Sequence, residues 1–86
     1  MMRDELRSPI KHHLVLHRID PEQRIRRFYS LMIERDLFGT VRLVRHWGRI
    51  GTNGQELVEV CASEIEAGEA LEAFAAAKRR RGYRDL

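Results

Sequence analysis

The spacing of apolar residues changes near Ser63. Before this position, apolar and polar side chains alternate over several segments, most clearly in residues 26–34 and 40–47. After it, apolar residues recur at intervals of three and four. Alternation places one row of side chains on one face of a strand, and the longer interval places them along one side of a helix. The chain is therefore predicted to be an α+β domain, an antiparallel sheet of three to four strands with one C-terminal helix packed on one face.

Turn signals separate the predicted strands. Residues 14–16 read as a short strand, residues 20–23 as a turn built on aspartate and proline, and residues 55–61 as the last strand. Asn53-Gly54 is a short-range hairpin signal. In residues 26–34, Tyr29, Leu31 and Ile33 form one row and give this strand one strongly apolar face.

The helix is marked at both ends. Ser63 and Glu66 have the spacing of a capping box. Four consecutive basic residues, 78–81, suit the negative end of the helix dipole, and Gly82 can adopt the left-handed conformation that ends a helix. The predicted buried stripe consists of Ala67, Ala70, Leu71, Phe74 and Ala77.

The length of 86 residues allows one folded domain. We assign it to residues 12–84 and expect residues 1–11 to form a flexible N-terminal segment. No apolar run approaches the ~20 residues of a membrane span, and the N-terminus lacks the apolar centre of a signal peptide. The single cysteine, Cys61, excludes an internal disulfide and is expected to be a buried thiol. These features predict a cytoplasmic, bacterial-type monomer with no membrane partner.

The net charge of +3 conceals three blocks. Residues 1–47 carry ten Lys and Arg against six Asp and Glu, residues 48–77 carry one against six, and residues 78–86 carry five against one. Blocks of this kind indicate separate faces, and a basic face favours polyanionic partners.

Trp47, the only tryptophan, stands two residues after Arg45 and two before Arg49. Residues two apart share a face in an extended strand, so the ring and the guanidiniums would offer a surface for a sugar or base beside a phosphate. Lys78 and Arg81 could add phosphate contacts. Two structural interpretations remain open: Trp47 as a core residue, and Arg49 lying across its ring as a cation–π pair.

These features together resemble the WGR domain, a family named for its Trp-Gly-Arg sequence, here residues 47–49. Further marks are Arg27-Phe28-Tyr29, Leu37-Phe38-Gly39, Asn53-Gly54-Gln55, and the basic run that leads into Gly82-Tyr83. The chain is similar to the small stand-alone bacterial members. The resemblance covers residues 12–84 and implies an antiparallel sheet with one helix, and a role in nucleic-acid binding.

In the members that accompany poly(ADP-ribose) polymerases, the Trp and Arg approach the sugar and phosphate at a DNA end. The resemblance therefore implies that Trp47 packs on a terminal sugar or base and that Arg49 binds phosphate. It implies no ADP-ribosylation, because 86 residues leave no room for the polymerase's catalytic domain.

Other chemistry finds little support in the sequence. His13 and His17 would lie ~13 Å apart along a strand, too far to share a metal ion. The glycines at 48, 51 and 54 are not followed by the Gly-Lys-Ser/Thr of a phosphate loop. No acid is paired with a nucleophile. We therefore expect no metal site, no cofactor, no catalytic residue and no enzyme activity.

The sequence, together with this resemblance, thus predicts a small non-catalytic nucleic-acid-binding module that contacts sugar and phosphate, with DNA favoured over RNA as its partner. The residues expected to contact it are Trp47, Arg49, Arg45, Lys78 and Arg81. The alternative is a protein–protein interaction module that uses the same surface for an acidic or aromatic partner. Salt separates the two, because phosphate contacts make log affinity fall steeply with log salt concentration.

Overall fold

A computed structural model describes residues 10–86 of the chain. The expected flexible segment, residues 1–11, falls mainly on residues 1–9, which lie outside the described residues; residues 10 and 11 begin the first strand. The elements follow in the order β1 (Ile10–Asp20), β2 (Ile25–Arg35), β3 (Val41–Arg49), β4 (Gln55–Cys61), α2 (Glu64–Arg80) and β5 (Arg84–Asp85).

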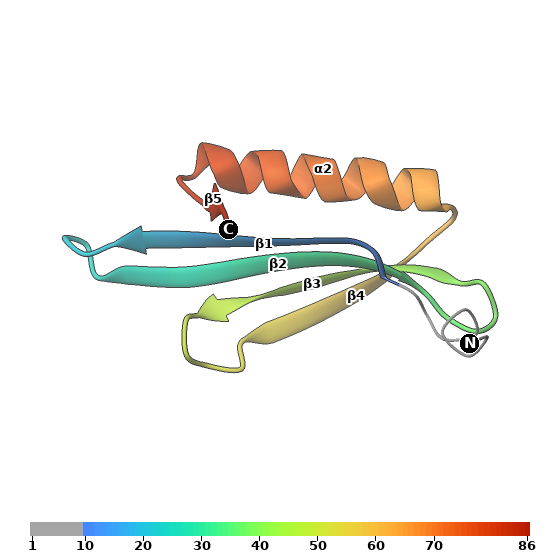
Figure 1. The fold of residues 1–86 in the computed structure, drawn as a ribbon, viewed down its shortest axis with the longest axis horizontal. Helices are drawn as coiled ribbons and strands as arrows, with labels where there is room; N and C mark the ends of the chain where they lie inside the picture. Colours follow the sequence, from blue (N-terminus) through green and yellow to red (C-terminus); the bar gives the residue numbers. More distant parts are fainter. Residues whose placement is uncertain (1–9) are drawn as a thin grey trace.

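The strands form one antiparallel sheet in the order β4-β3-β2-β1-β5, and α2 lies across one face of it (Figure 1). The α+β class with a C-terminal helix is therefore confirmed. The predicted count of three to four strands is wrong, because the sheet formed by residues 10–86 has five strands. The additional strand, β5, has two residues, and a segment of that length carries no periodic signal.

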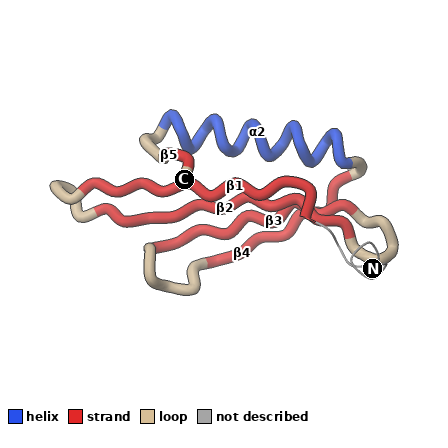
Figure 2. The backbone as a smooth tube through the Cα atoms, in the orientation of Figure 1, coloured by secondary structure: helices blue, strands red, loops and turns tan. Residues whose placement is uncertain are grey.

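The core lies between α2 and the sheet face that it covers (Figure 2). The row Tyr29, Leu31 and Ile33 is buried there, as the alternation predicts. The predicted helix stripe is right in part. Ala67 and Leu71 are buried as predicted, Ala75 is buried although it was not predicted, and Ala70, Phe74 and Ala77 are only half-buried at the margin of the core. Among the described residues, none forms a helix with the length and apolar character needed to cross a bilayer.

Both predicted helix ends are present. The Ser63 hydroxyl accepts a hydrogen bond from the Glu66 amide at 3.1 Å. At the other end, Gly82 has φ of 97° and donates to the Arg79 carbonyl, while Tyr83 donates to the Lys78 carbonyl. These two bonds form a Schellman motif. The motif turns the chain back toward the sheet, where the Tyr83 side chain is buried and β5 pairs with β1.

Replacing Ser63 with alanine is expected to lower the free energy of unfolding by ~1 kcal/mol, because an amide at the start of the helix loses its side-chain acceptor. Urea denaturation followed by circular dichroism measures this difference. Glu69→Gln, at an exposed position further along the same helix, is the control and should change stability by less than ~0.5 kcal/mol. Equal midpoints for Ser63→Ala and wild type would mean that the cap does not stabilise the helix.

Candidate functional site

Two neighbouring rows of side chains cross the helix-covered face near the end of β3. In the first row, Tyr29 on β2 pairs with Trp47 on β3. One step further along, Arg18 on β1 pairs with Arg27 on β2, and Arg27 pairs with Arg49 on β3. The prediction that Trp47 and Arg49 lie on one face is consistent with this register, because both share the parity of Val41 and Leu43, the residues of β3 that belong to the core cluster.

The β3–β4 hairpin holds Arg49 at its rim. The Arg49 carbonyl accepts hydrogen bonds from the Thr52 amide at 3.0 Å and the Thr52 hydroxyl at 2.7 Å. Gly51, third in this four-residue turn, has φ of 94°, as a type II turn requires. The hairpin predicted from Asn53-Gly54 is therefore present, but its tight turn lies earlier, because the loop spans residues 50–54.

The central glycine of the Trp-Gly-Arg sequence has a packing role. A Cβ on Gly48 would lie 2.7 Å from the Gly54 Cα and 3.4 Å from Cε1 of Phe28. A Cβ on Gly54 would overlap the Trp47 carbonyl oxygen. On the uncovered face of the sheet, His46 packs edge-on against Phe28 with ring centroids 5.0 Å apart, and its Nε2 donates to the Asn53 carbonyl. These contacts fix the loop against β3.

Trp47 is half-buried and stands between two hollows. Its ring is tilted against Tyr29, with centroids 6.5 Å apart. One hollow, of about 330 Å³, has three aromatic walls and is lined by Tyr29, Arg45, Trp47, Phe74 and Lys78. The other, of about 370 Å³, has two arginines in its lining, which consists of Arg27, Trp47, Gly48, Arg49, Thr52, Gly54 and Gln55.

Arg45 and Arg49 are in different environments. The Arg45 guanidinium lies 4.2 Å from the centroid of the Phe74 ring, and its Nε lies 3.7 Å from a Glu59 oxygen. Arg49 is exposed. Among residues 10–86, the cations found over aromatic rings are Arg45 and Lys78, so Arg49 does not lie across Trp47 as the cation–π interpretation required.

Lys78 approaches the same region from the last turn of α2. Its Nζ lies 4.6 Å from the ring centroid of Tyr29 and 5.3 Å from that of Tyr83. Burial lowers the pKa of Lys78, and the neighbouring charges of Arg81, Arg27 and Arg45 lower it further. A third hollow, of about 440 Å³, lies beside it and is lined by Arg18, Ile25, Arg27, Lys78, Arg81 and Tyr83.

Two residues of this surface, Arg18 and Arg27, were not among the predicted contact residues. Arg27 lies two positions before Tyr29, so the alternation in β2 already placed it in the row of buried residues. Arg18 joins that row only through the pairing of β1 with β2, which the sequence does not state. The structure brings Trp47, Arg45 and Lys78 around one hollow, and places Arg49 and Arg81 at the margins of the two others.

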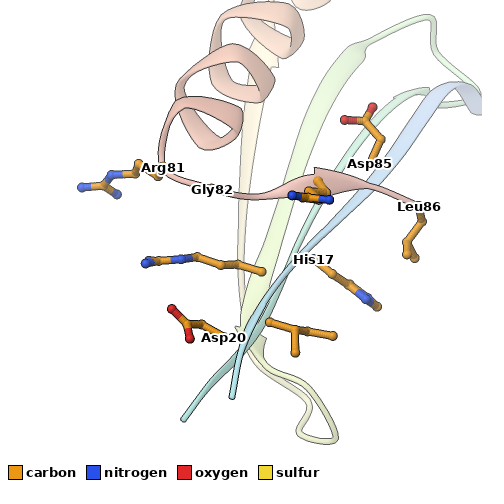
Figure 3. Close-up of a pocket in the computed structure, with 9 residues that line it drawn as sticks. His17, Asp20, Arg81, Gly82, Asp85 and Leu86 are labelled. Carbon is orange, nitrogen blue, oxygen red and sulfur yellow. The ribbon is translucent and has the colours of Figure 1, made fainter. Parts of the chain in front are cut away.

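The largest of these four hollows, of about 500 Å³, wraps around an edge of the sheet where β5 meets β1. Figure 3 shows that Arg81 and Asp20 lie on one side of these strands, whereas His17 and Leu86 lie on the other. Side chains on opposite sides of a strand cannot converge on one small ligand. Size alone therefore does not make this hollow the functional site.

Other reactive groups do not gather into a site within residues 10–86. No group of three His, Cys, Asp or Glu side chains is placed to hold a metal ion in this part of the chain. Cys61 is half-buried, where full burial was expected. Burial raises the pKa of its thiol, as do the charges of Glu59 and Glu66, so the thiol is not activated as a nucleophile.

The family model of the WGR domain matches residues 12–86, which confirms the resemblance read from the sequence. "Uncharacterized protein y4dW" of Sinorhizobium fredii (strain NBRC 101917 / NGR234) is 41% identical over 73 residues. The match covers 85% of this chain and 36% of that protein, so the chain spans about a third of the relative's length. No solved structure matches.

Proposed function

The chain belongs to the WGR domain family, and from that premise we propose that it is a non-catalytic nucleic-acid-binding module whose contact surface is centred on Trp47 and Arg49. The family is linked to nucleic-acid binding in proteins like the poly(ADP-ribose) polymerases. For this chain, the observation that carries the proposal is the position of Trp47 between an aromatic hollow and a hollow that bears arginines.

The two hollows match the two chemical parts of a nucleotide. The rings of Tyr29, Trp47 and Phe74 offer flat apolar surface, on which a sugar or a base can pack regardless of sequence. On the other side of Trp47, Arg27 and Arg49 offer guanidiniums, whose fork of donors suits phosphate oxygens. A nucleotide bound across the Trp47 ring would place its sugar or base in the aromatic hollow and its phosphate beside the two arginines.

The other three predicted contact residues differ in how directly they would contact the nucleic acid. Arg45 is held by Phe74 and Glu59, so it shapes the aromatic hollow more than it attracts phosphate. Lys78 supplies a cation at the rim of that hollow. Arg81 is exposed at the end of the helix and extends the positive surface. DNA is proposed over RNA, and a DNA end over an internal site, by analogy with the polymerase members of the family.

Replacing Arg49 with glutamine is expected to weaken DNA binding to a similar degree for every sequence and to lower the magnitude of the salt slope by ~1, because one phosphate contact is lost. Fluorescence anisotropy with a labelled DNA duplex at several salt concentrations measures both quantities. Thermal stability should remain nearly unchanged, since Arg49 is exposed and has no ion pair within the described residues.

Arg26→Gln is the matched control. Arg26 is exposed like Arg49 and carries the same charge, but it follows the opposite parity to Tyr29 on β2 and so belongs to the uncovered face. Equal affinities and salt slopes for the two variants would show that Arg49 does not contact the nucleic acid. Binding to a protein partner with a flat salt dependence, together with no binding to nucleic acid, would favour the protein-interaction alternative.

A further inference from the structure

Three arginines stand side by side across the sheet next to Trp47. Arg18, Arg27 and Arg49 are register partners on β1, β2 and β3. Neighbouring strands are ~4.8 Å apart, so the three backbone positions span roughly 10 Å. The row runs perpendicular to the strands and leads from the Trp47–Arg49 site toward β1 and β5, on the face that α2 covers (Figure 1).

The end of α2 adds two cations to this row. The Schellman motif at Gly82 places the last helical turn close to Arg18, since a Cβ on Gly82 would lie 3.4 Å from the Arg18 Nε. Lys78 and Arg81, from the same turn, line one hollow together with Arg18 and Arg27. Four of the six residues that line this hollow are therefore cationic.

None of these four cations forms an ion pair with a carboxylate of the described residues. The ion pairs there involve Arg35, Arg42, Arg45 and Arg79. The two acids that line a hollow together with Arg18 and Arg81 have other hydrogen-bond partners. Asp85 accepts two hydrogen bonds from Arg79, both of 2.8 Å, and Asp20 accepts from the amides of Glu22 and Gln23 in the β1–β2 turn.

Crowding of like charges destabilises a fold unless an anion offsets it. Burial is the main cause of the lowered pKa of Lys78, and the charges of Arg81 and Arg27 lower it further, in agreement with such crowding. A cluster of this kind at the rim of a hollow is suited to an anion with several acceptor oxygens.

We propose that Arg18, Arg27, Lys78 and Arg81 form a second phosphate subsite beside the Trp47–Arg49 site. The ligand is then an oligonucleotide strand held through at least two of its phosphates, and not a single terminal nucleotide. The inference rests on the proposed function, because the second subsite would bind the phosphate of a nucleotide that follows, in the same strand, the one packed against Trp47.

Binding of short 5′-phosphorylated oligothymidylates tests the second subsite. The probes are the mononucleotide and the trinucleotide, and the emission of Trp47, the only tryptophan, reports their binding. We expect the wild type to bind the trinucleotide more tightly than the mononucleotide. Arg18→Gln should weaken trinucleotide binding on the order of tenfold and lower its salt slope by ~0.7, with mononucleotide binding unchanged. Arg49→Gln should weaken both.

Arg26→Gln is again the control for loss of one charge, and Arg81→Gln is a second test variant at an exposed position. The second subsite is overturned if the two lengths bind equally, or if Arg18→Gln and Arg81→Gln bind the trinucleotide as tightly as Arg26→Gln does. In both cases the wild type still binds nucleotide at Trp47, so the proposed function survives. If neither length binds the wild type, the proposed function fails together with this inference.

Discussion

Replacing Leu71 with alanine is expected to lower the free energy of unfolding by about 2–5 kcal/mol. Leu71 is 2% exposed and lies at the centre of the helix face that packs on the sheet. Truncation removes apolar surface from the core and leaves a cavity, because the sheet residues below it cannot close the gap fully. Urea denaturation monitored by circular dichroism gives the difference directly.

The adjacent position provides the control for Leu71. Glu72→Ala is an exposed change in the same helical turn and should alter stability by less than ~0.5 kcal/mol. If Leu71→Ala costs no more than Glu72→Ala, α2 does not bury this face against the sheet in solution. The aromatic hollow beside Trp47 would then lose two of its walls, since Phe74 and Lys78 are supplied by the same helix.

Replacing Gly54 with alanine is expected to cost about 2–5 kcal/mol. The left-handed backbone conformation, with φ of 70°, accounts for ~1–2 kcal/mol of this in a residue with a Cβ. Steric overlap adds ~1–3 kcal/mol, because the new Cβ would meet the Trp47 carbonyl oxygen and lie 2.9 Å from Cζ of Phe28. The midpoint of thermal or urea unfolding measures the sum.

Gly51→Ala separates the two contributions. Gly51 also has a left-handed conformation, with φ of 94°, but a Cβ there would meet nothing within 4 Å. It should therefore cost only the ~1–2 kcal/mol of backbone strain. Equal losses for the two variants would show that the contact of the Gly54 backbone with Trp47 and Phe28 does not hold the loop in solution.

The sequence predicted those parts of the fold that depend on local patterns. The alternation of Tyr29, Leu31 and Ile33 and the cap at Ser63 each express a backbone geometry within a few residues, and both are present in the structure. β5 could not be predicted in this way. Its two residues become a strand only because the helix ends in a Schellman motif that returns the chain to β1.

The helix stripe and the candidate site also depend on contacts between elements, which local patterns do not predict. A helical period selects a stripe but does not fix how the helix is rotated on its sheet, so Ala75 is buried where Ala77 was predicted. The Trp47–Arg49 pair was predictable because both residues lie on one strand. The alternation in β2 places Arg27 in the row of Tyr29, but the proximity of Arg18 and Arg27 to Lys78 could not be predicted, since it follows from strand register and from the docking of α2.

Amide chemical-shift mapping tests the proposed contact surface most directly. The isotope-labelled chain is titrated with a short blunt DNA duplex, with and without 5′-phosphates, and with the matching RNA duplex. We expect the largest shifts near Arg27, in residues 47–49 and in residues 78–82, with larger shifts for DNA and for the phosphorylated end. Shifts confined to the uncovered face, around Met32, Val44 and Val58, or to the exposed Phe38 loop, would contradict binding through Trp47 and Arg49.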